Sequence, residues 1–289
     1  MVRLICPTWL EQKQAGAAGT RGISVTDWAL PFLENEVADA RRLAEVFAAE
    51  FALFDEIYDV AAQYLARAEI QTHEANKVLA SAILLRAREA ARSVRILSAL
   101  GLTADASVCA RTLMEALAKI GNAAKDPEFL KKFDASALTD RLKLHNVMRG
   151  RPEDRHLSKD DVFADLKKLA ADQRAEKLPT VEALLGNVGL SSAYDFAYRV
   201  QSGDAHVTPD SLKRYFVTDA KGEFAGMKEY PHEKEVSTVV VGAAISLLAS
   251  LVAWTEVVGV SLPERPALDK KIAELSEARK AKSAPGGRE

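Results

Sequence analysis

Four chemically different side chains recur at helical spacing in the third quarter of the chain. Asp195, Arg199, Ser202 and His206 lie three or four residues apart, and at about 100° per residue they share one helical face within roughly 60°. An imidazole titrates near neutral pH and can move a proton, while a guanidinium can bind a phosphate or stabilise developing negative charge. With Tyr198 beside this face, the spacing predicts a site for acid–base or phosphate chemistry. The alternative is a solvated face whose histidine caps the helix end.

A pair of opposite charges lies on an earlier, otherwise apolar helix. Between Ala106 and Ala118 the only charged residues are Arg111 and Glu115, and their spacing of four places them side by side. Charges in apolar surroundings are costly unless they are paired, so we expect them to neutralise each other or to meet a polar group from another helix. They are therefore candidate supporting residues of the site. The alternative is an ion pair that only fixes helix register.

Motifs that identify common enzyme classes are absent from the sequence. It has no glycine-rich nucleotide loop, no HExxH zinc motif and no GxSxG nucleophile motif. Its five histidines are not spaced as metal ligands, and its two cysteines form no CxxC. We therefore expect neither a metal nor another cofactor. A hydrolase built on Ser202 and His206 is disfavoured because nothing in the sequence supplies an oxyanion hole.

The elements that would position these residues are mostly helices. No proline occurs between Pro31 and Pro127, which favours long uninterrupted helices over about 31–68, 72–100 and 103–124. Gly101 is expected to end the second of them. Residues 215–225 carry the one hairpin-like pattern in the chain. The predicted fold class is all-α, an up-and-down bundle of long antiparallel helices with at most one small β-hairpin.

The chain divides by composition into three parts. Residues 1–26 form an N-terminal arm, residues 27–262 a single helical domain, and residues 263–289 a charged, partly disordered tail. Inside the domain, residues 141–159 carry six Lys or Arg against two acids, and Gly150 and Pro152 interrupt any helix there. We interpret this stretch as a basic, mobile connection.

Residues 236–260 contain a single charge, Glu256, and are long enough to span a membrane. Several Ser and Thr residues and the lack of Lys or Arg clusters at either end argue against a span. A helix buried in a bundle or a dimer interface explains the composition better, so we expect a homodimer and no membrane insertion. The net charge of −2 supplies no global attraction to nucleic acid. Few cysteines and no secretory signal fit a cytoplasmic protein.

Two short motifs resemble an uncharacterised all-helical bacterial family, domain of unknown function 5677. They are Arg111-Thr-Leu-Met-Glu115, followed by the helix start Asp126-Pro-Glu, and Tyr198-Arg-Val-Gln-Ser202-Gly-Asp-Ala-His206. The resemblance covers roughly Lys77 to Trp254. It implies an all-helical fold and no particular activity.

Arg199, six further residues and His206 are also similar to the Arg-spacer-His signature of the HEPN superfamily of helical bundles. That resemblance implies a metal-independent endoribonuclease or a nucleotide-binding protein of a bacterial defence or toxin–antitoxin type, acting as a dimer. It implies that His206 moves the proton of a ribose 2′-hydroxyl and that Arg199 holds the phosphate. Residues 141–159 would then contact RNA. The competing hypothesis is a non-catalytic ligand-sensing or protein-interaction module, so whether the chain is an enzyme stays open.

Overall fold

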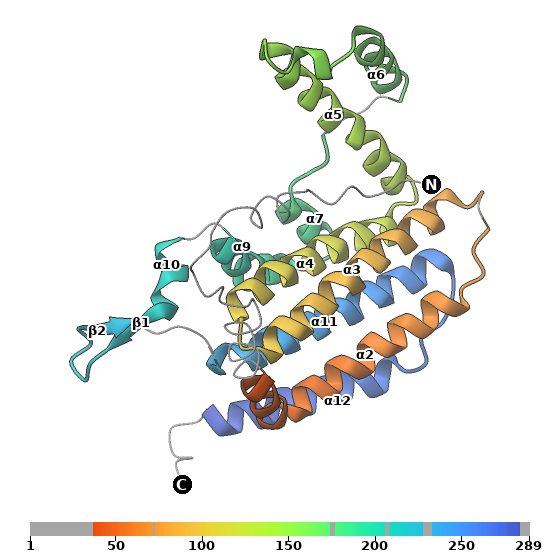
Figure 1. Ribbon diagram of the computed structural model, residues 1–289. Helices are drawn as coiled ribbons and strands as arrows, with labels where there is room; N and C mark the ends of the chain where they lie inside the picture. Colours follow the sequence, from red (N-terminus) through yellow and green to blue (C-terminus); the bar gives the residue numbers. More distant parts are fainter. Residues whose placement is uncertain (1–36, 72, 174–176, 206–207, 228–232, 284–289) are drawn as a thin grey trace, which may run out of the picture. The chain divides into compact units, whose positions relative to one another are not determined.

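The computed structural model describes residues 37–71, 73–173, 177–205, 208–227 and 233–283 (Figure 1). Asp39–Glu289 form one compact unit, separate from Met1–Ala38. The N-terminal arm, residues 1–26, and the helix start predicted near Pro31 lie outside the described residues. The described part is helical apart from one small antiparallel sheet, so the all-α prediction is confirmed.

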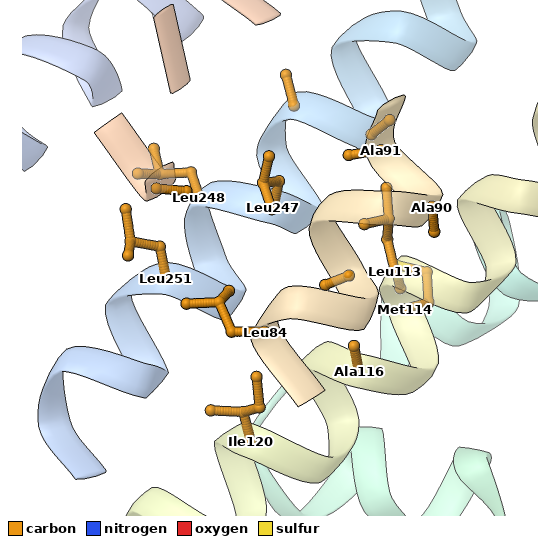
Figure 2. Packing of buried hydrophobic residues seen from close by; sticks show 14 of the residues in the cluster. Leu84, Ala90, Ala91, Leu113, Met114, Ala116, Ile120, Leu247, Leu248 and Leu251 are labelled. Atoms are coloured by element: carbon orange, nitrogen blue, oxygen red, sulfur yellow. The ribbon is translucent and has the colours of Figure 1, made fainter. Parts of the chain in front are cut away.

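The core is built from four long helices. They are α2 (Ala48–Arg67), α3 (Ala75–Ala99), α4 (Thr103–Lys125) and α11 (Glu233–Val258), and α11 packs against the other three. Figure 2 shows where α3, α4 and α11 meet: Leu84, Leu113, Ile120, Leu247 and Leu251 form one apolar cluster, and each is fully buried. Burial of each such side chain stabilises the fold by about 1.5–3 kcal/mol.

The helix α11 is covered inside its own chain. It is long and apolar enough to cross a membrane, but 67% of its most apolar window is buried in the protein. Two of its buried hydroxyls bond within the helix, since Ser250 donates to the Ser246 carbonyl at 2.8 Å and Thr255 to the Val252 carbonyl at 2.7 Å, while the buried Ser237 donates to the Glu50 carboxylate of α2 at 2.6 Å. The expectation of a homodimer rested on the need of this helix for additional cover, and α2, α3 and α4 provide that cover.

Gly101 ends α3 as the sequence predicts. Its φ of 73° lies in the left-handed region, which favours glycine. The Leu102 N–H donates to the Leu97 carbonyl at 2.9 Å and the Gly101 N–H to the Ser98 carbonyl at 3.0 Å. These two bonds form a Schellman motif, which satisfies the last carbonyls of the helix and turns the chain into α4.

A helix pair follows the core helices α2, α3 and α4. Helix α5 (Phe129–Gly150) packs against α6 (Asp160–Asp172), with a short 3-10 turn, η2 (Arg155–Leu157), between them. The stretch 141–150, which we assigned to a basic connection, forms the second half of α5, because Gly150 is the last residue of that helix and Pro152 lies beyond it. Only residues 151–159 connect the two helices.

Short elements then lead to the hairpin. They are α7 (Val181–Asn187), α8 (Ser191–Ala193), the π-helical turn η3 (Tyr194–Tyr198), α9 (Arg199–Ala205), α10 (Pro209–Leu212) and the 3-10 turn η4 (Lys213–Tyr215). Strands β1 (Phe216–Thr218) and β2 (Phe224–Met227) pair antiparallel, where the sequence predicts a hairpin. Helix α9 packs on α4, which brings the two candidate motifs together.

The last helix, α12 (Arg265–Ser283), packs on α2 and α11. Leu268 is 1% exposed and belongs to the core, and the Tyr64 hydroxyl of α2 donates to the Glu264 carboxylate at 2.7 Å. Lys271 pairs with Glu56 at 2.7 Å. The segment that we separated as a charged tail, 263–289, thus contains an ordered helix that covers the bundle.

Candidate functional site

The structure brings Arg111, Glu115 and Tyr198 into one polar cluster between α4 and η3. The Arg111 Nε donates to the Glu115 Oε1 at 3.2 Å and lies 3.1 Å from the Tyr198 hydroxyl oxygen. The Tyr198 hydroxyl donates to the same Glu115 oxygen at 3.2 Å. The two charges on α4 therefore neutralise each other and also meet a polar group from another helix. We call these three residues the Arg111 cluster.

Aromatic contacts complete the Arg111 cluster. The Arg111 guanidinium carbon lies 5.0 Å from the centre of the Tyr198 ring, within the range of a cation–π interaction. Tyr194, one turn earlier, stacks on Tyr198 with ring centroids 5.3 Å apart. The Tyr198 side chain is thus held by a hydrogen-bonded ion pair and by stacking, which anchors the start of α9 to α4.

The cluster alters the titration of its members. Burial, and next the charge of Glu115, raise the pKa of the Tyr198 phenol above its usual value. Burial acts to lower the pKa of Arg111, but the hydrogen bond with Tyr198 and the charge of Glu115 outweigh burial, so that the pKa is raised. Both shifts favour the proton-bound forms, in which the phenol is neutral and the guanidinium charged. The cluster is therefore suited to holding helices together at neutral pH.

A π-helical turn interrupts the helix that carries the predicted polar face. The Arg199 N–H donates to the Tyr194 carbonyl, five residues back, where an α-helix would use the residue four back. The extra residue in this turn offsets the side chains before and after it by about 100°. The arc calculated for an uninterrupted α-helix therefore does not hold across the turn.

The structure divides the described residues of the predicted face between solvent and the protein interior. Arg199 and Asp195 lie outside, with side chains 68% and 57% exposed, and form a long ion pair of 3.8 Å. The Ser202 hydroxyl oxygen is buried, and among the described residues it has no hydrogen-bond partner. His206 lies outside the described residues, so its position relative to Arg199 stays a prediction.

The basic stretch 141–159 is partly tied down by its neighbours. The His145 Nδ1 lies 2.8 Å from the Ser158 hydroxyl, and Arg149 pairs with Asp160 while stacking 4.7 Å from the ring centre of Phe163. Other cations of the stretch point into solvent: they are Arg141, Lys143, Arg151, Arg155 and Lys159. Two of them form exposed ion pairs, Lys143 with Asp140 at 3.0 Å and Arg151 with Asp154 at 3.7 Å, and exposed pairs are weak enough for a polyanion to replace the acid.

Sequence reasoning missed a buried amide that fixes α7 on α4. The Asn122 side chain donates to the Ala118 and Leu184 carbonyls, each at 2.7 Å, and accepts from Asn187 at 3.2 Å. An asparagine in an apolar stretch of α4 is the signal that could have revealed it, because a buried amide needs partners. Its role is structural, since it satisfies the backbone of α7 and thereby positions the segment that leads to Tyr198.

Sequence reasoning also missed a hollow beside the Arg111 cluster. It has a volume of about 250 Å³ and is lined by Glu115 together with Thr112, Arg86, Lys119 and apolar side chains of α3, α4 and α5. A hollow of this size takes only a small ligand. Within the described residues, no three His, Cys, Asp or Glu side chains lie close enough to hold a metal ion.

Comparison with known proteins places the site in a family. A family model described as "Family of unknown function (DUF5677)" matches residues 77–224. No curated protein and no solved structure matches the chain. The match includes α4 and η3, and hence the whole Arg111 cluster, but it ends before α11, whereas the resemblance was expected to reach Trp254. Because the match covers a little over half of its length, this chain belongs to the family of unknown function DUF5677.

Proposed function

We propose that the chain is an HEPN-like, metal-independent endoribonuclease in which Arg199 and His206 act on the RNA backbone. The observation that carries the proposal is the exposure of Arg199: its side chain is 68% exposed, and its ion pair with Asp195 is long, at 3.8 Å. An exposed pair of this kind holds a guanidinium only weakly. A phosphate can therefore replace Asp195 as its partner.

The position of Arg199 directly after Tyr198 supports the proposal. The Arg111 cluster anchors Tyr198 on α4, so the backbone that carries Arg199 is held in place while its side chain stays in solvent. A fixed backbone lowers the entropy cost of placing a guanidinium against a transition state. The proposal thus assigns Arg111, Glu115 and Tyr198 positioning roles and reserves contact with RNA for Arg199 and His206.

The chemistry needs no metal. His206, as a neutral imidazole, takes the proton of a ribose 2′-hydroxyl, and the 2′-oxygen attacks the adjacent phosphorus. The bond to the 5′-oxygen breaks, that oxygen takes a proton from water, and a 2′,3′-cyclic phosphate remains. Arg199 stabilises the negative charge that develops on the phosphate oxygens. The exposed cations of 141–159 would hold the RNA backbone, which makes binding weaker at high salt.

The test is cleavage of labelled RNA in EDTA. Wild-type protein is expected to cut the RNA, whereas His206→Ala and Arg199→Ala are expected to lose at least about 100-fold in rate. Arg92→Ala is the matched control, because Arg92 is an exposed arginine on α3, far along the chain from the proposed site. Intact RNA at high protein concentration, or equal cutting by wild type and both site variants, would refute the proposal.

A second candidate function has its own observation. The hollow of about 250 Å³ beside Glu115 combines one acid with Arg86, Lys119 and the Thr112 hydroxyl, a lining suited to a small zwitterion. In that case the chain is a non-catalytic ligand-sensing module. Thermal melts with amino acids would show a rise in Tm for wild type and a smaller rise for Lys119→Ala. No rise with any of them removes this candidate.

The remaining expectations are part of the proposal. We expect the protein to act in the cytoplasm as a homodimer, in a bacterial defence or toxin–antitoxin setting. Light scattering on the purified chain measures its mass in solution, and fractionation of expressing cells separates soluble from membrane-bound protein. A protein found in the membrane fraction would favour α11 as a span.

A further inference from the structure

The hairpin carries an apolar face. In its register Phe216 lies opposite Met227 and Thr218 opposite Phe224, and directly opposite residues point to the same side of a sheet. The Phe216 and Phe224 rings meet edge to face, with centroids 5.7 Å apart, which places the two pairs on one side. We call Phe216, Thr218, Phe224 and Met227 the hairpin face. It contains no charged residue.

Solvent reaches the hairpin face. Phe216, Phe224 and Met227 are 43%, 64% and 72% exposed. A two-stranded hairpin alone is only marginally stable in water, and it usually needs an apolar face packed against something. Three large apolar side chains gathered on one small face differ from singly scattered ones, because together they form a patch that can be buried in one step.

Charges at the two ends of the hairpin are opposite. The turn carries two acids, Asp219 and Glu223, against one lysine, Lys221, while two cations, Lys213 and Arg214, come three and two residues before Phe216, the first residue of β1. The Asp219 carboxylate accepts from the backbone N–H groups of Lys221 and Glu223, at 2.8 and 2.9 Å, so it is held at the tip. The hairpin therefore has an acidic tip and a basic base.

We propose that the hairpin face binds the same face of a second copy of this chain. Two identical patches can meet about a two-fold axis, so that the apolar residues of each face pack against the same residues of the other copy. The two hairpins then run in opposite directions, an arrangement that we call head-to-tail, and the acidic tip of each hairpin lies over the basic base of its partner. Both the apolar face and the end charges are then matched in one contact. The inference is independent of RNA cleavage, and it moves the dimer contact from α11 to β1 and β2.

Sedimentation velocity over a range of concentrations tests the contact. Wild type is expected to be a dimer, whereas Phe224→Lys and Met227→Lys are expected to weaken the dimer at least about tenfold, because each buries an unpaired charge. Leu144→Lys is the matched control, since Leu144 is 58% exposed on α5. Circular dichroism verifies that each variant remains folded. A wild type that stays monomeric, or a dimer that survives in both hairpin variants, overturns the proposal.

Charge reversal tests the orientation with variants that leave the apolar face intact. Glu223→Lys alone and Lys213→Glu alone each create two repulsive contacts in a head-to-tail homodimer, so each is expected to dimerise more weakly, by about tenfold. Mixed together, the two variants place opposite charges at both ends and are expected to form a heterodimer with restored affinity. If mixing restores nothing while each variant alone is weakened, the head-to-tail contact is wrong.

Discussion

Replacing Tyr198 by phenylalanine tests whether the Arg111 cluster holds α9 on α4. The change removes one hydroxyl and leaves the ring, its stacking on Tyr194 and its contact with the Arg111 guanidinium. The hydroxyl takes part in two hydrogen bonds, at 3.1 Å to Arg111 and 3.2 Å to Glu115. Each bond to a charged group is worth about 1.5–3 kcal/mol when buried.

Solvent reduces that figure. The Arg111 and Glu115 side chains are 28% and 30% exposed, so water can replace part of what the hydroxyl provides. The ion pair between them also survives the substitution, and it keeps both charges partnered. We therefore expect Tyr198→Phe to lower the free energy of unfolding by about 1–2 kcal/mol. For a unit of this size, that corresponds to a fall in Tm of about 2–8 °C.

The measurement is urea unfolding of wild type, Tyr198→Phe, Glu115→Gln and the double variant. Since both residues belong to one hydrogen-bonded cluster, the two single effects should not add, and the coupling should reach about 0.5–2 kcal/mol. Tyr58→Phe is a control for the loss of a tyrosine hydroxyl elsewhere, because Tyr58 on α2 makes its described contacts through its ring. A Tyr198→Phe variant as stable as wild type, with strictly additive effects, refutes the anchoring argument.

Three further predictions follow from local features. Folding raises the pKa of Tyr198 above 10.0, so the stability that its neutral phenol contributes is fully present below about pH 10 and is lost as pH rises through the raised pKa. The free energy of unfolding, measured between about pH 9 and 11, should therefore fall more steeply for wild type than for Tyr198→Phe. Gly101→Ala should destabilise the fold by about 1–2 kcal/mol, because the φ of Gly101 is 73°. Gly242→Ala should stabilise it by about 0.5–1 kcal/mol, because Gly242 lies inside α11 and an added Cβ meets nothing within 4 Å. Chemical denaturation measures both changes, and changes of the same sign would contradict the reasoning. Leu251→Ala should lower the free energy of unfolding by about 3–4 kcal/mol, because the Leu251 side chain is 0% exposed. Ile245→Ala should lower it by less than about 1.5 kcal/mol, because Ile245 on the same helix is 43% exposed. Comparable losses in the two variants would show that the core is not where the structure has it.

Local sequence patterns account for most of the helices. A proline-free run with apolar residues every three or four positions predicted α2, α3 and α4, and a glycine at the right place predicted the end of α3. The first of these helices, expected without interruption over about 31–68, is broken by a turn at Phe47 directly before α2. The composition of α11 left two interpretations, because a membrane span and a core helix need the same apolar residues. The contacts of α11 with three other helices show how much of it is covered within the chain, and contacts between distant segments leave no periodic trace in one segment.

In the candidate site, too, local spacing predicted some contacts and the packing of distant segments decided the others. Spacing of four along one helix was enough to predict that Arg111 and Glu115 lie side by side, because neighbours on a helix depend only on helical geometry. Tyr198 is 87 residues from Arg111, and only the packing of α9 on α4 makes it the third member of the cluster. The same packing decides that the Arg199 side chain lies in solvent while the Ser202 hydroxyl, on the same helix, is buried.

By itself, therefore, the sequence determined the helical class, the hairpin, the stop at Gly101 and the pairing of two charges, since each follows from residues close together in the chain. The tertiary structure decided which side of the Tyr194–Ala205 segment faces the bundle. The tertiary structure also decided that α12, which lies in the charged C-terminal segment, packs on α2 and α11 and covers the core. The physical reason is that burial of apolar area is shared among segments distant in sequence, and the arrangement that buries most of it can override the geometry of any single helix.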